Sequence, residues 1–86
     1  MSPIKLRALI EAKRFAESEL ERRSPARKII QELVIHFKAL WIIRTRTGSL
    51  KCAQVSAQCS HMKGDRGLLN AWLKAAADQI AKETGF

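Results

Sequence analysis

The fold of this chain depends on the stretch SPARKIIQELVIHFKALWIIRTR, residues 24–46. No other part of the sequence is as dense in apolar residues. At 100° per residue, one broad stripe of a helix would collect most of the large apolar side chains. We therefore predict a central helix over residues 25–46, with a buried stripe formed by Ile29, Ile30, Leu33, Val34, Phe37, Leu40 and Trp41.

The same helix would carry a second apolar surface on its far side. Ile35 and Ile42, seven residues apart, would lie together there, with Ala39 and Ile43 close by. A second apolar surface on so short a chain must meet another helix, a second copy of the chain or a different partner. We predict a homodimer whose interface contains Ile35, Ala39, Ile42 and Ile43.

Helix start and stop signals divide the rest of the chain. Ser2 and Ser24 can each cap a helix, and each precedes a proline, which is favoured at the first helical position. Gly48 with its neighbours and the loop 63–67 separate the remaining periodic segments. The sequence thus predicts an all-α fold in one domain, residues 1–86, built as a small antiparallel bundle of about four helices over 3–22, 25–46, 50–62 and 68–84.

A hairpin is the alternative for the middle of the chain. Residues 41–47 and 50–55 alternate tolerably between apolar and polar side chains, and Gly48-Ser49 lies between them. The sequence leaves open whether residues 41–56 form a helix, a loop and a helix or a β-hairpin.

The charge of the chain is strongly positive and unevenly distributed. The net charge is +8 and the pI is about 10.2. Residues 22–66 hold ten basic and two acidic side chains, whereas both ends are neutral. Such a basic segment suits a polyanion, an acidic protein surface or an anionic membrane.

Several of these cations have a structural explanation, but others do not. Arg22, Arg23, Arg44 and Arg46 would lie near helix carboxyl ends, where the dipole favours cations. A cation in the first turn of the central helix is instead disfavoured by ~0.3–1 kcal/mol. The predicted helix would also hold two basic groups ~30 Å apart. The candidate residues for binding nucleic acid or an acidic partner are Arg22, Arg23, Arg27, Lys28, Arg44, Arg46, Lys51 and Arg66.

The sequence argues against catalytic and metal chemistry. On a helix, Cys52 and Cys59 would be ~10.5 Å apart, too far to share a metal ion or form a disulfide. No Gly-rich phosphate loop, nucleophile elbow or paired carboxylates occur in the chain. We expect no enzyme, no cofactor, no metal and no small-molecule substrate.

A helix-turn-helix over residues 49–84 is disfavoured. Arg66, Asn70 and Lys74 would run along one side of the last helix, as base-reading side chains do. Asp78 continues that side and would repel phosphate. Recognition of a base sequence by this helix is therefore not expected.

These features predict a small cytoplasmic protein that binds nucleic acid mainly through phosphate contacts, in an accessory or regulatory role. The amino terminus lacks a signal-peptide core, and we expect no membrane association. The alternative is a protein-binding adaptor or inhibitor, of the type carried by phages and mobile elements, that docks on an acidic surface of a larger partner.

Overall fold

The protein has a mixed α/β fold rather than an all-α one. The computed structural model describes residues 2–85, which form three α-helices and a three-stranded antiparallel sheet. In chain order the elements are α1 (Pro3–Glu21), α2 (Ala26–Phe37), β1 (Leu40–Ile43), β2 (Thr47–Cys52), β3 (Val55–Ser60), the 3-10 helix η1 (His61–Lys63) and α3 (Gly64–Thr84). The prediction of a four-helix bundle is therefore wrong.

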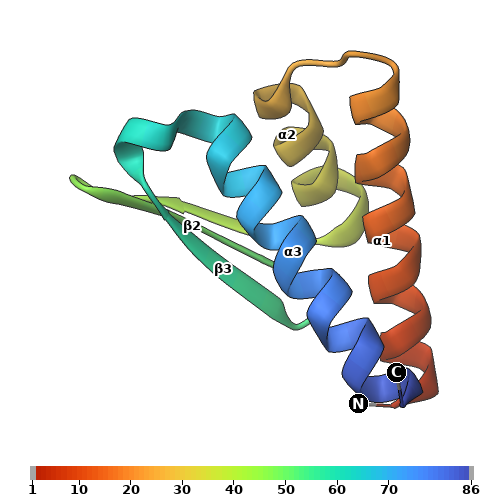
Figure 1. The fold of residues 1–86 in the computed structure, drawn as a ribbon. Coiled ribbons are helices and arrows are strands. Elements are labelled where there is room, and N and C mark those ends of the chain that lie inside the picture. Colours follow the sequence, from red (N-terminus) through yellow and green to blue (C-terminus); the bar gives the residue numbers. More distant parts are fainter. Residues whose placement is uncertain (1, 86) are drawn as a thin grey trace.

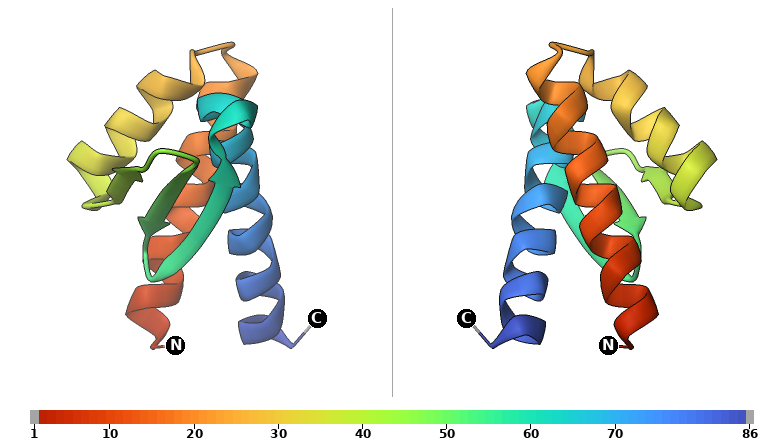
Figure 2. Two further views of the ribbon diagram at one scale, coloured as in Figure 1. Left: turned by 90° about the vertical axis from the view of Figure 1, so that its left-hand side faces the viewer. Right: turned by 90° about the vertical axis from the view of Figure 1, so that its right-hand side faces the viewer.

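The elements pack in layers. The sheet has the strand order β1-β2-β3, and α3 lies across one of its faces, with α2 beside it over β1 (Figure 1). The helix α1 packs against α2 and α3 on the side away from the sheet (Figure 2). No helix among residues 2–85 covers the other face of the sheet, so that face is open to solvent.

The predicted central helix ends after three turns. Lys38 adopts the left-handed conformation, with φ 55°, and the N–H of Ala39 donates to the Leu33 carbonyl at 3.2 Å. The chain then reverses into β1, whose β-branched and aromatic residues suit a strand. The prediction of one helix over 25–46 is wrong because the helix closes at Phe37 without a glycine or proline to mark its end.

Two tight turns connect the strands. The N–H of Arg44 donates to the Thr47 carbonyl at 2.8 Å and closes the turn between β1 and β2. Ala53 and Gln54, both with positive φ (51° and 69°), form the turn between β2 and β3. Two such residues in succession are typical of a type I′ hairpin turn. The predicted helix over 50–62 is wrong, and the hairpin alternative is closer, although Gly48-Ser49 lies inside β2 rather than at a turn.

The outer helices agree better with the sequence. The prediction of a first helix is confirmed: Ser2 caps α1, its hydroxyl accepting from the Lys5 N–H at 3.3 Å. The last helix is also confirmed, but it begins at Gly64, so the predicted loop over 63–67 is wrong. Ser24 does not cap α2; its hydroxyl donates to a Glu19 carboxylate oxygen at 2.8 Å.

The core lies between the sheet and the three helices. Trp72 of α3 is fully buried at its centre, and its indole N–H donates to the Val55 carbonyl at 3.1 Å. This bond ties the start of β3 to α3. No helix within residues 2–85 has the length and apolar character needed to cross a membrane. The buried apolar residues are Leu9, Ala12, Ala16, Ile29, Ile30, Leu33, Ala39, Leu50, Cys52, Val55, Leu68, Leu69, Trp72 and Ala76.

Candidate nucleic-acid interface

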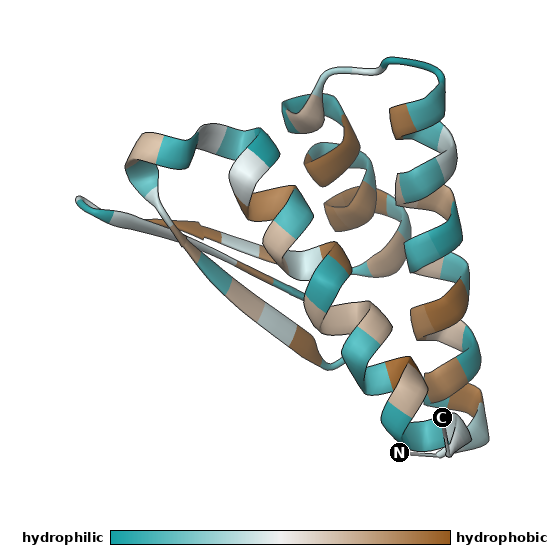
Figure 3. Cartoon of the chain, viewed as in Figure 1, coloured by the Kyte–Doolittle hydropathy of each residue, from teal (hydrophilic) through white to brown (hydrophobic). Residues whose placement is uncertain are grey.

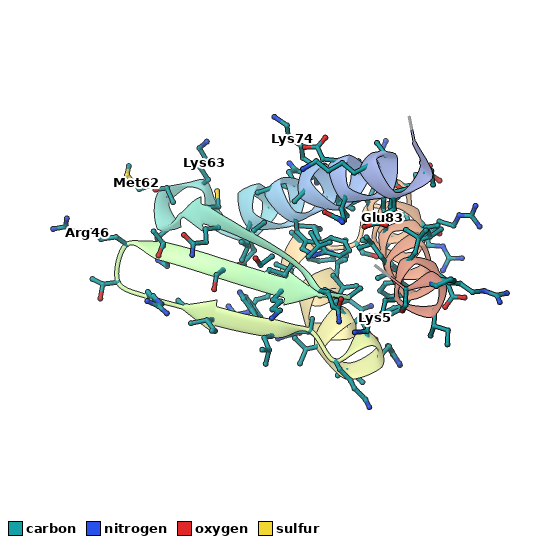
Figure 4. The ribbon with its side chains drawn as sticks, turned by 90° about the horizontal axis from the view of Figure 1, so that it is seen from below. Lys5, Arg46, Met62, Lys63, Lys74 and Glu83 are labelled. Carbon is teal, nitrogen blue, oxygen red and sulfur yellow. The ribbon has the colours of Figure 1, made fainter. Side chains whose placement is uncertain are left out.

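One end of the sheet brings together two segments that are distant in sequence. The N–H of His61, the first residue of η1, donates to the carbonyl of Arg46 in the β1–β2 turn at 2.8 Å. A small cavity at this end is lined by Ile43 and Gly48 of the hairpin and by Asp65 of α3. Figure 4 shows Arg46, Met62 and Lys63 at this same end of the molecule.

We call the cations of this end the basic tip: Arg44 and Arg46 of the β1–β2 turn, Lys63 of η1 and Arg66 of the first turn of α3. All of them are exposed. Within residues 2–85, no carboxylate forms an ion pair with any of them. Their positive charge is therefore left for solvent or a ligand.

The cations of α1 contrast with the basic tip. Lys13 pairs with Glu17 at 2.7 Å, and Arg7 approaches Glu11 to 3.7 Å. The two partners of each pair are one helical turn apart on the surface of α1, where such a pair contributes ~0.3–0.5 kcal/mol to stability. Because a neighbouring carboxylate balances their charge, these cations attract a polyanion less than the basic tip does.

Some predicted binding residues lie around the turn between α1 and α2. Arg22 approaches Glu19 at 3.8 Å, and Arg23 has the left-handed φ of 62°. Arg27 and Lys28 occupy the first turn of α2, and the Arg27 guanidinium lies 6.0 Å from the centre of the Trp41 ring. A cation–π contact thus gives Arg27 a structural role.

The arrangement of these charges differs from the prediction. The α1–α2 turn and the basic tip both lie in the half of the molecule away from the chain ends (Figure 1). Lys51 stands apart on the open face of the sheet, where its register neighbours are Leu40 and Ser56. Two basic groups ~30 Å apart on one helix cannot form, because α2 has 12 residues and spans ~18 Å.

A groove between β3 and α3 extends the basic tip. Its polar lining comes from Gln58 and Ser60 of β3, from Lys63, and from Asn70 and Lys74 of α3. In Figure 4 the Lys74 side chain points outward from α3 on the same side as Lys63. Two ammonium groups and two amides along one groove could donate to a row of phosphate oxygens.

A glycine sets the closeness of this packing. A Cβ atom built on Gly67 would meet the Cβ of Lys63 at 2.5 Å and the sulfur of Cys59 at 3.3 Å. Any larger residue at position 67 would therefore prevent the start of α3 from approaching η1 and β3 this closely. Gly67 thus sets how close Lys63 lies to the first turns of α3.

Sequence reasoning missed part of this groove. The sequence analysis places Lys63 in the loop 63–67, and Gln58 and Ser60 in the helix predicted over 50–62. The alternation of Val55, Ala57 and Cys59 with Ser56, Gln58 and Ser60 is a strand signal that would have placed them correctly. The helix-turn-helix that the sequence disfavours is absent from residues 49–84, because residues 50–60 form strands and their turn and give α3 no partner helix of that kind.

The cysteines show no reactive arrangement. Burial raises the pKa of the Cys52 thiol to about 11, so that it stays protonated at neutral pH. Cys52 lies opposite Val55, and Cys59 follows four residues later on β3, ~13 Å along the strand. A disulfide between them is excluded by strand spacing rather than by the helical spacing first assumed. Among residues 2–85, no three potential ligands of the His, Cys, Asp and Glu types gather as a metal site.

The predicted interface residues form most of a second, apolar surface. Ile35, Ile42 and Ile43 are 69%, 44% and 59% exposed, whereas Ala39 is 4% exposed and lies in the core, where it can touch no partner. Figure 3 shows apolar residues on α2 and the sheet behind α3. We call the exposed apolar residues of α2 and β1 the apolar surface: Val34, Ile35, Leu40, Ile42 and Ile43.

Comparisons of the chain with models of known protein families, with curated proteins and with solved structures found no match.

Proposed function

We propose that this protein binds the backbone of duplex nucleic acid through the basic tip and the adjoining β3–α3 groove, as an accessory or regulatory factor. The observation that carries the proposal is the set of exposed cations in the basic tip, none of which has a carboxylate partner among residues 2–85.

The chemistry of the basic tip suits phosphate. Arginine presents a planar fork of donors that matches phosphate oxygens, and lysine adds a compact charge. The amino terminus of α3 lies beside them, and its dipole adds a further positive potential. Along the groove, the side-chain amides of Gln58 and Asn70 add uncharged donors.

The distribution of aromatic residues favours a duplex over a single strand. Proteins that bind single strands stack bases on exposed aromatic rings. Within residues 2–85 no phenylalanine or tryptophan side chain is exposed: Trp72 is buried, and Phe15, Phe37 and Trp41 are half-buried. A regular duplex presents its phosphates on the outside and needs no stacking surface.

The salt dependence of binding tests this proposal. Fluorescence anisotropy would measure Kd for DNA and RNA duplexes of ~20 base pairs at salt concentrations from roughly 50 to 300 mM. With four or five phosphate contacts, log Kobs should fall with log[salt] with a slope of about −4. The double variant Arg44→Ala/Arg46→Ala should lose affinity and bring the slope closer to zero by about 2.

A charge-matched control separates a site from general attraction. Arg7→Ala/Lys13→Ala also lowers the net charge by two, but these residues lie on α1 and are paired with carboxylates. It should leave most of the affinity and the slope intact. Equal effects of both double variants, or an affinity that hardly changes with salt, would refute the proposal.

A second candidate function uses the apolar surface as well. A protein that docks on an acidic surface of a larger partner needs both cations and an apolar contact area, and this chain exposes both. Purification without nuclease discriminates the two. Co-eluting nucleic acid supports the first function; a nucleic-acid-free protein that fails to bind either duplex at low salt supports the second.

A further inference from the structure

The strand β1 is an edge strand with a free row of backbone groups. In an antiparallel ladder, residues alternate between pairs that exchange hydrogen bonds and pairs that do not. The bond between Arg44 and Thr47, together with the register Ile42↔Ser49, turns the backbone groups of residues 40, 42 and 44 toward β2. The N–H and C=O groups of Trp41 and Ile43 therefore point away from the sheet.

This edge lacks the features that normally prevent strand pairing. Edge strands are usually protected by a lysine, a proline, a bulge or a covering segment. Residues 40–43, Leu-Trp-Ile-Ile, contain no charged residue and no proline, and the register with β2 runs without a bulge. At the opposite edge, β3 lies against α3 and carries Ser56, Gln58 and Ser60.

The apolar surface surrounds this free edge. Val34 and Ile35 of α2 line a shallow groove with Trp41, and Leu40 and Ile42 project from the open face of the sheet. Together the apolar surface exposes roughly 500 Å² per chain, within the ~300–600 Å² of the largest patch on a typical monomer, which is often functional. A stable dimer buries ~800 Å² per partner, so this surface and the strand edge would supply more than half of that area.

We propose that a second copy of the chain occupies this surface, with the two β1 strands paired antiparallel across a two-fold axis to form one continuous sheet. Trp41 then lies opposite Ile43 of the partner subunit, and by symmetry Ile43 lies opposite Trp41 of the partner subunit. The two residues of each pair exchange backbone hydrogen bonds. Ile42 lies on the axis beside Ile42 of the partner subunit, and this pair exchanges no backbone hydrogen bonds.

Other symmetric registers satisfy fewer backbone groups. With Trp41 on the axis, the outward groups of Ile43 would face Ala39, whose N–H already donates to the Leu33 carbonyl. With Ile43 on the axis, Trp41 would face Thr45, which lies in the turn between β1 and β2. The register centred on Ile42 is the one that pairs all the outward groups of β1.

The symmetry of this surface suits a second copy. Across a two-fold axis both subunits use the same set of donors, acceptors and apolar side chains, as an isologous interface requires. The cations beside the surface include Arg44, Arg27, which lies 6.0 Å from the centre of the Trp41 ring, and Lys51, which faces Leu40 in the sheet register. Arg44, the cation that directly follows β1 in the chain, would lie opposite Leu40 of the partner subunit. The two Arg44 residues would be ~13 Å apart along the paired strands, beyond the screening length at physiological salt.

A cross-linking experiment tests this register. In pairs that do not exchange hydrogen bonds the Cα atoms are ~4.5 Å apart, within the ~4.4–6.8 Å range for a disulfide. The variant Ile42→Cys, made together with Cys59→Ser to remove the half-buried native thiol, should form a covalent dimer on mild oxidation. Ser56→Cys in the same background places an exposed thiol on the opposite edge strand and should remain monomeric on a non-reducing gel.

Sedimentation of the unmodified protein completes the test. The native chain should sediment as a dimer, and Ile43→Lys should sediment as a monomer with an unchanged far-UV circular dichroism spectrum. Cross-linking of Ile42→Cys no faster than that of Ser56→Cys would overturn the proposal. So would a native chain that is monomeric at all concentrations, which would assign the apolar surface to another protein. Neither result depends on nucleic-acid binding, so this proposal and the proposed function fail independently.

Discussion

The turn between β2 and β3 offers a direct test of the fold. Gln54 is exposed and has a φ of 69°, a left-handed conformation that costs an L-residue ~1–2 kcal/mol and glycine almost nothing. Gln54→Gly removes that cost, but it also gives the unfolded chain more freedom, which offsets ~0.4–1 kcal/mol. We therefore expect the free energy of unfolding to rise by about 0.5–1 kcal/mol.

The same substitution in an extended segment should have the opposite sign. Gln58 is also exposed, but it lies inside β3, where glycine costs ~0.5–1 kcal/mol. Urea unfolding followed by circular dichroism should separate Gln54→Gly from Gln58→Gly by about 1–2 kcal/mol, with unchanged m values. If Gln54→Gly destabilises the protein as much as Gln58→Gly does, residue 54 is not in a left-handed turn and the β2–β3 hairpin is wrong.

Two further predictions concern buried groups. Trp72→Phe keeps an aromatic ring but removes the donor to the Val55 carbonyl. The unpaired buried carbonyl and the lost packing should lower the free energy of unfolding by about 2–4 kcal/mol in the same urea assay. A loss under ~1 kcal/mol would contradict this hydrogen bond. Because burial raises the Cys52 pKa to about 11 from 9.0, iodoacetamide at pH 8 should modify Cys59 first, as peptide mass spectrometry can show. The contribution of the Cys52 thiol to the free energy of unfolding should be constant below pH 9. It should fall between pH 9 and 11, where the thiol ionises only in the unfolded chain, by at most ~1.4 kcal/mol per pH unit. A Cys52→Ser variant with the same alkaline decline would show that other groups cause it.

The outer helices were predictable because their signals are local. Ser2 caps α1, and Gly85 ends α3 with a φ of 80°. Serine is typical of the start of a helix and glycine of its end, so the sequence indicates both positions. The apolar periodicity of α3, with Leu69, Trp72 and Ala76 buried, agrees with one helical face against the core. The predicted start of α3 is wrong because Gly64 and Gly67 resemble loop residues, whereas Gly67 lies inside α3 and lets the helix pack closely against Lys63 and Cys59.

The middle of the chain could not be predicted because its turns lack the usual residues. The end of α2 is a left-handed lysine, Lys38, where a glycine is typical. The β2–β3 turn is Ala53-Gln54, where Asn-Gly is typical. Meanwhile Gly48, a residue type that indicates a turn, lies inside β2, where an added Cβ atom would be 3.4 Å from a Leu68 methyl carbon, an ordinary contact distance. Tertiary packing decides the conformation at each of these positions, and no local pattern reports it.

The unpartnered apolar surface has a simpler origin than the secondary structure around it. A chain of this length closes one small core, and its buried apolar set already includes Ile29, Ile30 and Leu33 from the stretch 24–46. Apolar residues beyond that number must face outward whether their segment is helical or extended. Ile35 and Ile42 were placed opposite the core on a helix, and they remain outside it with Ile42 in a strand. The strand adds what the helix would not have had: a free backbone edge, which gives the outward isoleucines a geometry in which a second copy can pair.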